Sequence, residues 1–67
     1  MQVTINGRPT NTKGWNYLSE AIHAEGVAEQ KGIAVAVNDH VIPKSEWAER
    51  KLDQGDKILI IRASAGG

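Results

Sequence analysis

The sequence predicts an α+β fold, in which a mixed sheet of four to five strands has one main helix packed on one face. Three observations predict it: apolar and polar residues alternate at the start of the chain, one short segment has apolar residues at helical spacing, and β-branched runs follow. The 67 residues, 40% of them apolar, can bury about 60% of the unfolded surface. We therefore expect one small core and a single domain.

The first two strands are predicted to form a hairpin at an edge of the sheet. Residues 1–6 alternate between apolar and polar side chains, the period of a half-buried strand. Asn6 and Gly7 both tolerate positive φ, so they favour a two-residue turn. A short strand then runs back through residues 10–12, and Pro9 favours an edge position because it has no amide hydrogen.

A short helix is predicted next. Leu18, Ala21 and Ile22 are spaced i, i+3 and i+4 and form one narrow apolar stripe. Asn16 suits the N-cap, and Gly26 is placed to end the helix in a left-handed conformation. Such a short helix needs packing against a sheet to be stable.

The β-branched run at residues 33–37, Ile-Ala-Val-Ala-Val, predicts a central strand. Its larger side chains are expected to face the core and its alanines the other side of the sheet. Residues 38–39 turn the chain, and residues 41–42 begin a partner strand that Pro43 closes.

Residues 45–48 are predicted to form a single helical turn with Ser45 as its cap, and Trp47 is expected to pack structurally. A turn with Gly55 at positive φ leads into the last strand, residues 57–62, which is apolar on both faces. The first and last strands can then pair in parallel at the centre, through a crossover that contains the helix. This order is that of a β-grasp, ubiquitin-like roll over residues 1–62.

Composition excludes several classes of protein. With no cysteine, the chain has neither disulfides nor a cysteine-ligated zinc site. Eight basic residues balance eight acidic ones, which argues against a nucleic-acid partner. No apolar run approaches membrane-spanning length and no signal peptide opens the chain, so we expect no membrane partner and a cytoplasmic location.

An active site is not evident in the sequence. His23 and His40 lack a supporting arrangement of serine and carboxylate, and the glutamates on the helical segments are expected to be solvated charges. The five glycines before Arg62 are isolated turn residues, so no phosphate-binding loop is present. We therefore do not expect an enzyme, and no catalytic or metal-binding residue is assigned.

The residues after Arg62 carry the chemistry that remains. Residues 63–67, Ala-Ser-Ala-Gly-Gly, are small and are expected to form a flexible tail. Ala65 and Gly66 can thread a narrow channel and bring the Gly67 carboxylate to another protein's reactive centre. A carboxylate becomes a good electrophile once ATP adenylates it, and a partner enzyme must do this. The expected reactive atom is the Gly67 carbonyl carbon.

Several segments resemble the ThiS family, the sulfur carrier proteins of thiamine biosynthesis, over nearly the whole chain. They are Val-Ala-Val-Asn at 35–38, Val-Ile-Pro-Lys at 41–44, Trp47, Leu52, Gly55-Asp56, Ile58, Ile60 and Ala-Gly-Gly at 65–67. The resemblance implies that a ThiF-like, E1-like enzyme uses ATP and magnesium to adenylate Gly67. Sulfur from a persulfide, such as that of a cysteine desulfurase, then yields a thiocarboxylate that donates sulfur to thiazole synthase. The chain itself is expected to bind no cofactor.

The ubiquitin-like pattern also suggests a docking surface on the last strand. It leaves Leu59 and Ile61 on the outer face of the sheet. Ile58 and Ile60, which alternate with them, face inward. We hypothesise that these two residues, with Ala36 nearby, dock the adenylating enzyme, because one helix can cover only one face. Burial beneath a loop or in a dimer is the alternative. Arg62 would steer the tail or pair with an acidic partner, or remain a solvated cation.

Other functions stay open at this stage. The small subunit of molybdopterin synthase uses the same tail chemistry. A β-grasp module could also act through non-covalent binding alone. A protein modifier, joined through Gly67 to lysines of other proteins, is a further alternative.

Overall fold

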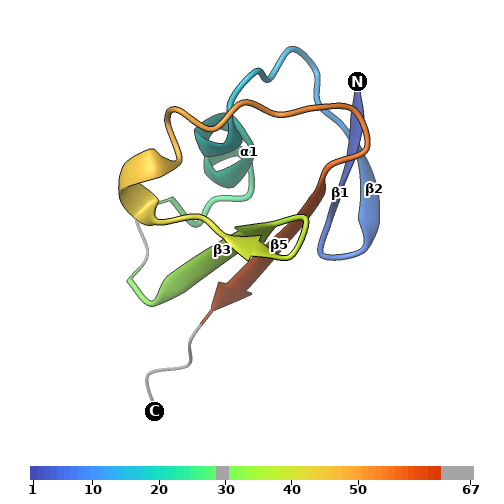
Figure 1. Cartoon of the computed structure of the whole chain (residues 1–67). Helices are drawn as coiled ribbons and strands as arrows, with labels where there is room; N and C mark the ends of the chain where they lie inside the picture. The colour runs from blue at the N-terminus through green and yellow to red at the C-terminus, as the bar shows by residue number, and fades with distance from the viewer. Residues whose placement is uncertain (29–30, 63–67) are drawn as a thin grey trace.

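The first and last strands of the chain run parallel, side by side, in the sheet (Figure 1). They are β1 (Gln2–Ile5) and β5 (Lys57–Arg62), and β5 is the central strand of the order β2-β1-β5-β3-β4. The Thr4 N–H donates to the Asp56 carbonyl and the Asn6 N–H to the Ile58 carbonyl, both at 2.9 Å. This confirms the predicted central pairing of the terminal strands.

The computed structural model describes residues 1–28 and 31–62. The remaining elements are β2 (Arg8–Asn11), α1 (Leu18–Ala24), β3 (Ile33–Val37), β4 (His40–Val41) and the 3-10 turn η1 (Lys44–Glu46). A five-stranded mixed sheet with α1 across one face confirms the predicted α+β, β-grasp class (Figure 1).

The β1–β2 hairpin lies at one edge of the sheet, as predicted. Asn6 and Gly7 have φ of 50° and 82°, so both residues of the turn are left-handed. Pro9 lies in the edge strand opposite Thr4. The second strand ends at Asn11, one residue earlier than the sequence suggested, although the Thr12 N–H still donates to the Met1 carbonyl at 2.9 Å.

The predicted helix forms, but Asn16 is not its N-cap. α1 begins at Leu18 with Tyr17 at the N-cap position, and the Glu20 carboxylate accepts the N–H groups of Asn16 and Tyr17 at 2.9 and 3.1 Å. The prediction was wrong because a distant segment binds the residues before the helix. The Asn16 carbonyl accepts the Leu52 N–H at 2.9 Å, and the next residue, Tyr17, forms an antiparallel bridge with Lys51.

The C-terminal end of α1 follows the prediction. The helix ends at Ala24, and Gly26 has φ of 77°, the left-handed conformation that closes a helix without strain from a Cβ atom. Leu18, Ala21 and Ile22 are fully buried against the sheet. Packing rather than length therefore stabilises this helix of 7 residues.

β3 alternates as predicted, with Val35 and Val37 buried and the alanines on the opposite face. Asn38 and Asp39 have φ of 51° and 71° and form the predicted turn. The partner strand β4 starts at His40, one residue before the predicted start.

The helical turn after β4 is also displaced from its predicted position. η1 spans Lys44–Glu46 with Pro43 at its N-cap, because the Pro43 carbonyl accepts the Glu46 N–H at 2.8 Å. Ser45 lies inside the turn and does not cap it. Trp47 is buried and its Nε1–H donates to the Ile42 carbonyl at 2.9 Å, which confirms a structural role.

One core joins the sheet to α1. It consists of Val3, Ile5, Leu18, Ala21, Ile22, Val27, Val35, Val37, Trp47, Leu52 and Ile58. The residues come from β1, α1, the segment after α1, β3, the loop before β5 and β5 itself, so burying them fixes these segments relative to one another.

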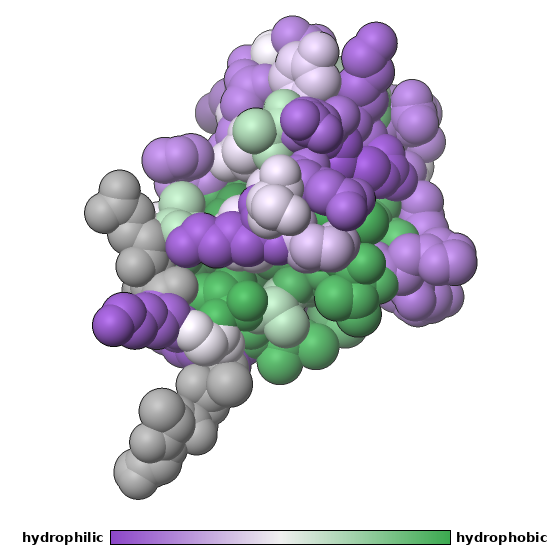
Figure 2. Space-filling model, turned by 60° about the vertical axis from the view of Figure 1, so that its left-hand side comes forward, coloured by the Kyte–Doolittle hydropathy of each residue, from purple (hydrophilic) through white to green (hydrophobic). Residues whose placement is uncertain are grey.

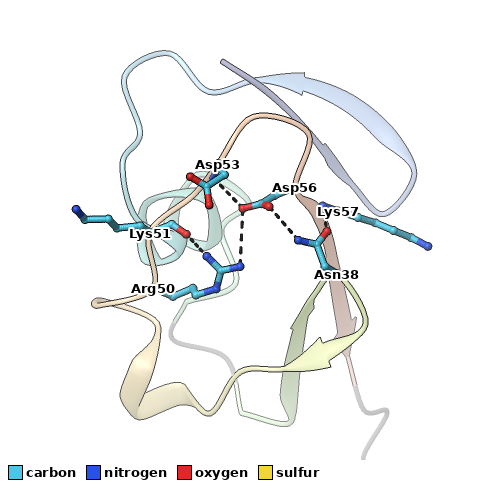
Figure 3. Close-up of polar contacts among 6 residues, drawn as sticks. All are labelled: Asn38, Arg50, Lys51, Asp53, Asp56 and Lys57. Carbon is cyan, nitrogen blue, oxygen red and sulfur yellow. Dashed lines mark hydrogen bonds and ion pairs between the residues drawn. The ribbon is translucent and has the colours of Figure 1, made fainter.

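A polar cluster around Asp56 fixes the loop that leads into β5 (Figure 3). The buried Asp56 carboxylate accepts Asn38 Nδ2–H at 3.0 Å and the Asp53 N–H at 2.8 Å, and lies 4.0 Å from the Arg50 guanidinium. Asn38 Oδ1 accepts the Lys57 N–H at 3.0 Å. The carboxylate therefore ties the β3–β4 turn to the first residue of β5.

Asp56→Ala should lower the free energy of unfolding by about 2–4 kcal/mol, because two part-buried hydrogen bonds, from Asn38 Nδ2–H and the Asp53 N–H, lose their charged acceptor. Chemical denaturation measures this. Asp53→Ala is the matched control: the Asp53 side chain is exposed, so its removal should cost less than about 0.5 kcal/mol. Equal losses in the two variants would contradict this role of Asp56.

Candidate functional site

β5 leads from the core to the residues for which the sequence predicts chemistry. Arg62 is the last residue of this strand. Ala65, Gly66 and Gly67, the predicted threading and reactive residues, lie outside the described residues. The site that the structure does describe is therefore the strand from which they follow and the surface around it.

The two faces of β5 differ as predicted. Ile58 is fully buried and Ile60 is half-buried, whereas the side chains of Leu59 and Ile61 point outward, with the residues 42% and 51% exposed. The alternative of burial beneath a loop is therefore wrong for the described part of the chain.

The strand register gathers further apolar residues on the outer face. Ala36 of β3 lies opposite Leu59 on one side and Val41 of β4 on the other, and Ala34 lies opposite Ile61. Paired residues in neighbouring strands share a face. We call these five residues, Ala34, Ala36, Val41, Leu59 and Ile61, the outer apolar patch.

Sequence reasoning missed Val41, which is 74% exposed. The signal was present in the turn: a two-residue turn at Asn38 and Asp39 places residue 41 opposite residue 36. Ala36 and Leu59 also line a shallow hollow of about 310 Å³, with Asp39 and Lys57 beside them. Figure 2 shows hydrophobic surface gathered into one continuous area that hydrophilic residues border.

Arg62 lies at the end of β5 and is exposed. It also lines a second hollow, of about 290 Å³, together with Asn6, Glu25, Val27 and Ile60. Glu25 in this hollow is paired with Arg8, the two side chains lying 2.9 Å apart. The structure thus gives the end of β5 an apolar outer side and an opposite side on which charged and polar residues border apolar ones.

The described residues contain no group of three or more histidine, cysteine, aspartate or glutamate side chains that could hold a metal ion. His23 lies in the last turn of α1 and His40 begins β4. No helix in residues 1–28 or 31–62 has the length and apolar character needed to cross a membrane.

Comparison with known proteins identifies the family. The model of the ThiS family matches residues 3–67. This chain belongs to the ThiS family. The fold agrees: the crystal structure of the thiamine biosynthesis protein ThiS from Geobacter metallireducens superposes with a TM-score of 0.81 at 25% identity, covering 100% of both chains. The predicted resemblance is confirmed.

Two curated relatives add to this. The sulfur carrier protein ThiS of Escherichia coli (strain K12) is 40% identical over 38 residues, 57% of this chain and 58% of that protein. A thiazole synthase of Paramagnetospirillum magneticum (strain ATCC 700264 / AMB-1) is 31% identical over 67 residues, 100% of this chain and 20% of that protein. The matched segment thus spans less than two thirds of each relative. Neither relative is a molybdopterin synthase, so these matches favour the thiamine carrier over that alternative.

The outer position of Ile61 can be tested by stability alone. Ile61→Glu should change the free energy of unfolding by less than about 1 kcal/mol, because the residue is already half-exposed and lies outside the core. Ile58→Glu, in the same strand, places a charge in the core and should cost roughly 4 kcal/mol or more. Urea denaturation of both variants is the measurement, and similar losses would contradict the assignment of faces.

Proposed function

We propose that this chain is a sulfur carrier protein for the thiazole-forming step of thiamine biosynthesis. The observation that carries the proposal is the match of the ThiS family over residues 3–67, together with similarity to the carrier of Escherichia coli. The chain acts as a co-substrate of other enzymes rather than as a catalyst. We place this function in the cytoplasm, where ATP and cysteine-derived sulfur are both present.

The reacting group of the proposal is the Gly67 carboxylate. A ThiF-like enzyme, with its own ATP and magnesium, joins the carboxylate to AMP and releases pyrophosphate. A persulfide, such as that of a cysteine desulfurase, attacks the carbonyl and expels AMP, and a thiol then breaks the sulfur–sulfur bond. The product is a thiocarboxylate, an ionised sulfur nucleophile. The absence of cysteine supports this use, because no internal thiol competes for the activated carbonyl.

The outer apolar patch is the proposed docking surface for the adenylating enzyme. Leu59 and Ile61 belong to the strand that leads to Gly67, so a partner bound there lies close to the start of the tail. Ala34 and Ala36 leave room between the larger side chains for apolar groups of the partner. Arg62, exposed at the end of the same strand but on its opposite side, can pair with an acidic residue at the partner's rim.

Thiazole synthase is the proposed sulfur acceptor. The support is the thiazole synthase of Paramagnetospirillum magneticum, in which a segment similar to this whole chain makes up 20% of the protein. A chain that carries both parts keeps them at high local concentration. We infer that the separate chain transfers sulfur to such an enzyme directly.

Ile61→Glu should lower kcat/KM for adenylation by about tenfold or more, mainly through KM, because it puts an unpaired charge into an apolar interface. Asn11→Glu is the matched control, since it adds the same charge to an exposed residue of the edge strand β2. ATP-dependent pyrophosphate release measures both variants. Unchanged kinetics for Ile61→Glu would remove the patch from the proposal.

Deleting Gly67 should abolish thiocarboxylate formation while changing the free energy of unfolding by less than about 0.5 kcal/mol, since terminal residues rarely support a core. The assay is incubation with ATP, a ThiF-like enzyme and a persulfide donor, followed by mass spectrometry. The unchanged protein should exchange one C-terminal oxygen for sulfur, and so should the control Ser64→Ala. Failure of the unchanged protein to do so would contradict the proposed function.

A further inference from the structure

The last residues of β5 are held unequally on their two sides. β3 pairs with β5 as far as Arg62, but β1 pairs with it only as far as Ile58, because the chain turns at Asn6. Beyond Ile58, a side chain rather than the backbone accepts the hydrogen bond from β5 on the β1 side. The Ile60 N–H donates to Asn6 Oδ1 at 2.8 Å.

This contact continues the parallel ladder by one step. The Thr4 N–H donates to the carbonyl of Asp56 and the Asn6 N–H to the carbonyl of Ile58, each at 2.9 Å. In an evenly spaced parallel ladder, the next donor is the Ile60 N–H and the next acceptor is the carbonyl of residue 6. At φ of 50° the backbone of Asn6 has left the strand direction, and its side-chain oxygen takes that acceptor's place.

We propose that Asn6 is a positioning residue for activation of the Gly67 carboxylate, an inference that rests on the proposed carrier function. Asn6 holds β5 two residues before Arg62, the residue from which the predicted tail follows. The hollow of about 290 Å³ lined by Asn6, Ile60 and Arg62 lies on this side of the strand. Because side chains do not fill that space, this hydrogen bond holds the strand end on the β1 side, while β3 holds it on the other.

The direction of the strand end matters because the reacting atom lies far along the chain from it. The chain after Arg62 spans at most about 3.3–3.6 Å per residue, so the direction in which β5 ends limits the positions that Gly67 can reach. Reaction at a bound partner depends on how often the reacting groups adopt the productive geometry. Pairing with β3 still holds Leu59 and Ile61 when Asn6 is changed. Loss of the contact should therefore lower kcat and leave KM nearly unchanged.

Two substitutions separate the hydrogen bond from the turn. Asn6→Gly removes the acceptor and keeps the left-handed turn, whereas Asn6→Asp keeps an acceptor oxygen. Asn38→Gly is the matched control. Asn38 also opens a two-residue turn, at φ of 51°, and its Oδ1 accepts the Lys57 N–H at 3.0 Å, at the opposite end of β5.

Two measurements test the proposal: amide hydrogen exchange followed by NMR, and steady-state adenylation with a ThiF-like enzyme. In Asn6→Gly, we expect the Ile60 amide to exchange about threefold to tenfold faster and kcat to fall by a similar factor, the range of one net hydrogen bond. KM should change less than about twofold. Asn6→Asp should restore both values, and Asn38→Gly should leave kcat unchanged.

Unchanged exchange of the Ile60 amide in Asn6→Gly would overturn the contact itself. Faster exchange with unchanged kcat, or an equal fall of kcat in Asn38→Gly, would overturn the positioning role. If the unchanged protein is not adenylated at all, the proposed function fails, and the role of Asn6 in activation fails with it. The exchange measurement still decides whether Asn6 holds the strand, so the two failures are distinguishable.

Discussion

Parallel pairing of β1 with β5 is the constraint on which the rest of the fold depends. It joins the two ends of the described chain, so everything between them must form a crossover that returns to the same sheet. α1 packs on the sheet within this crossover and supplies Leu18, Ala21 and Ile22 to the core. Because β5 is also the central strand, its start is paired on both sides, while its end is paired with β3 alone as far as Arg62.

The composition of β5 follows from this central position. A strand covered by a helix on one face needs apolar side chains only there, yet four consecutive residues of β5, 58–61, are apolar. Ile58 and Ile60 belong to the inner side, while Leu59 and Ile61 extend the apolar surface made with Ala36 and Val41. Exposed apolar surface of this kind is typical of interaction sites, and this is the reason for proposing that a partner docks there.

Strand positions and faces were predictable because they depend on local alternation, and the turns at Asn6 and Asn38 because a two-residue turn needs left-handed residues. The cap predicted at Asn16 was wrong because the Leu52 N–H, distant in sequence, binds its carbonyl. The cap predicted at Ser45 was wrong for a local reason, since the 3-10 turn is capped two residues earlier, at Pro43. The exposure of Val41 follows from the register of the hairpin at Asn38, which local sequence does indicate. Of these three, only the position of Asn16 depends on a contact that neighbouring residues could not reveal.

Asn6 shows how one residue can serve the turn and the central strand together. A left-handed conformation takes its carbonyl out of the ladder, which would leave the Ile60 N–H without an acceptor on that side. Glycine accepts the same φ but has no oxygen to offer, and longer side chains adopt it at a cost. Asparagine meets both needs, since its amide oxygen reaches the position that the backbone vacates. A protein whose proposed role is to present its last residue benefits from this arrangement, because the rigid part then continues almost to the point where the tail begins.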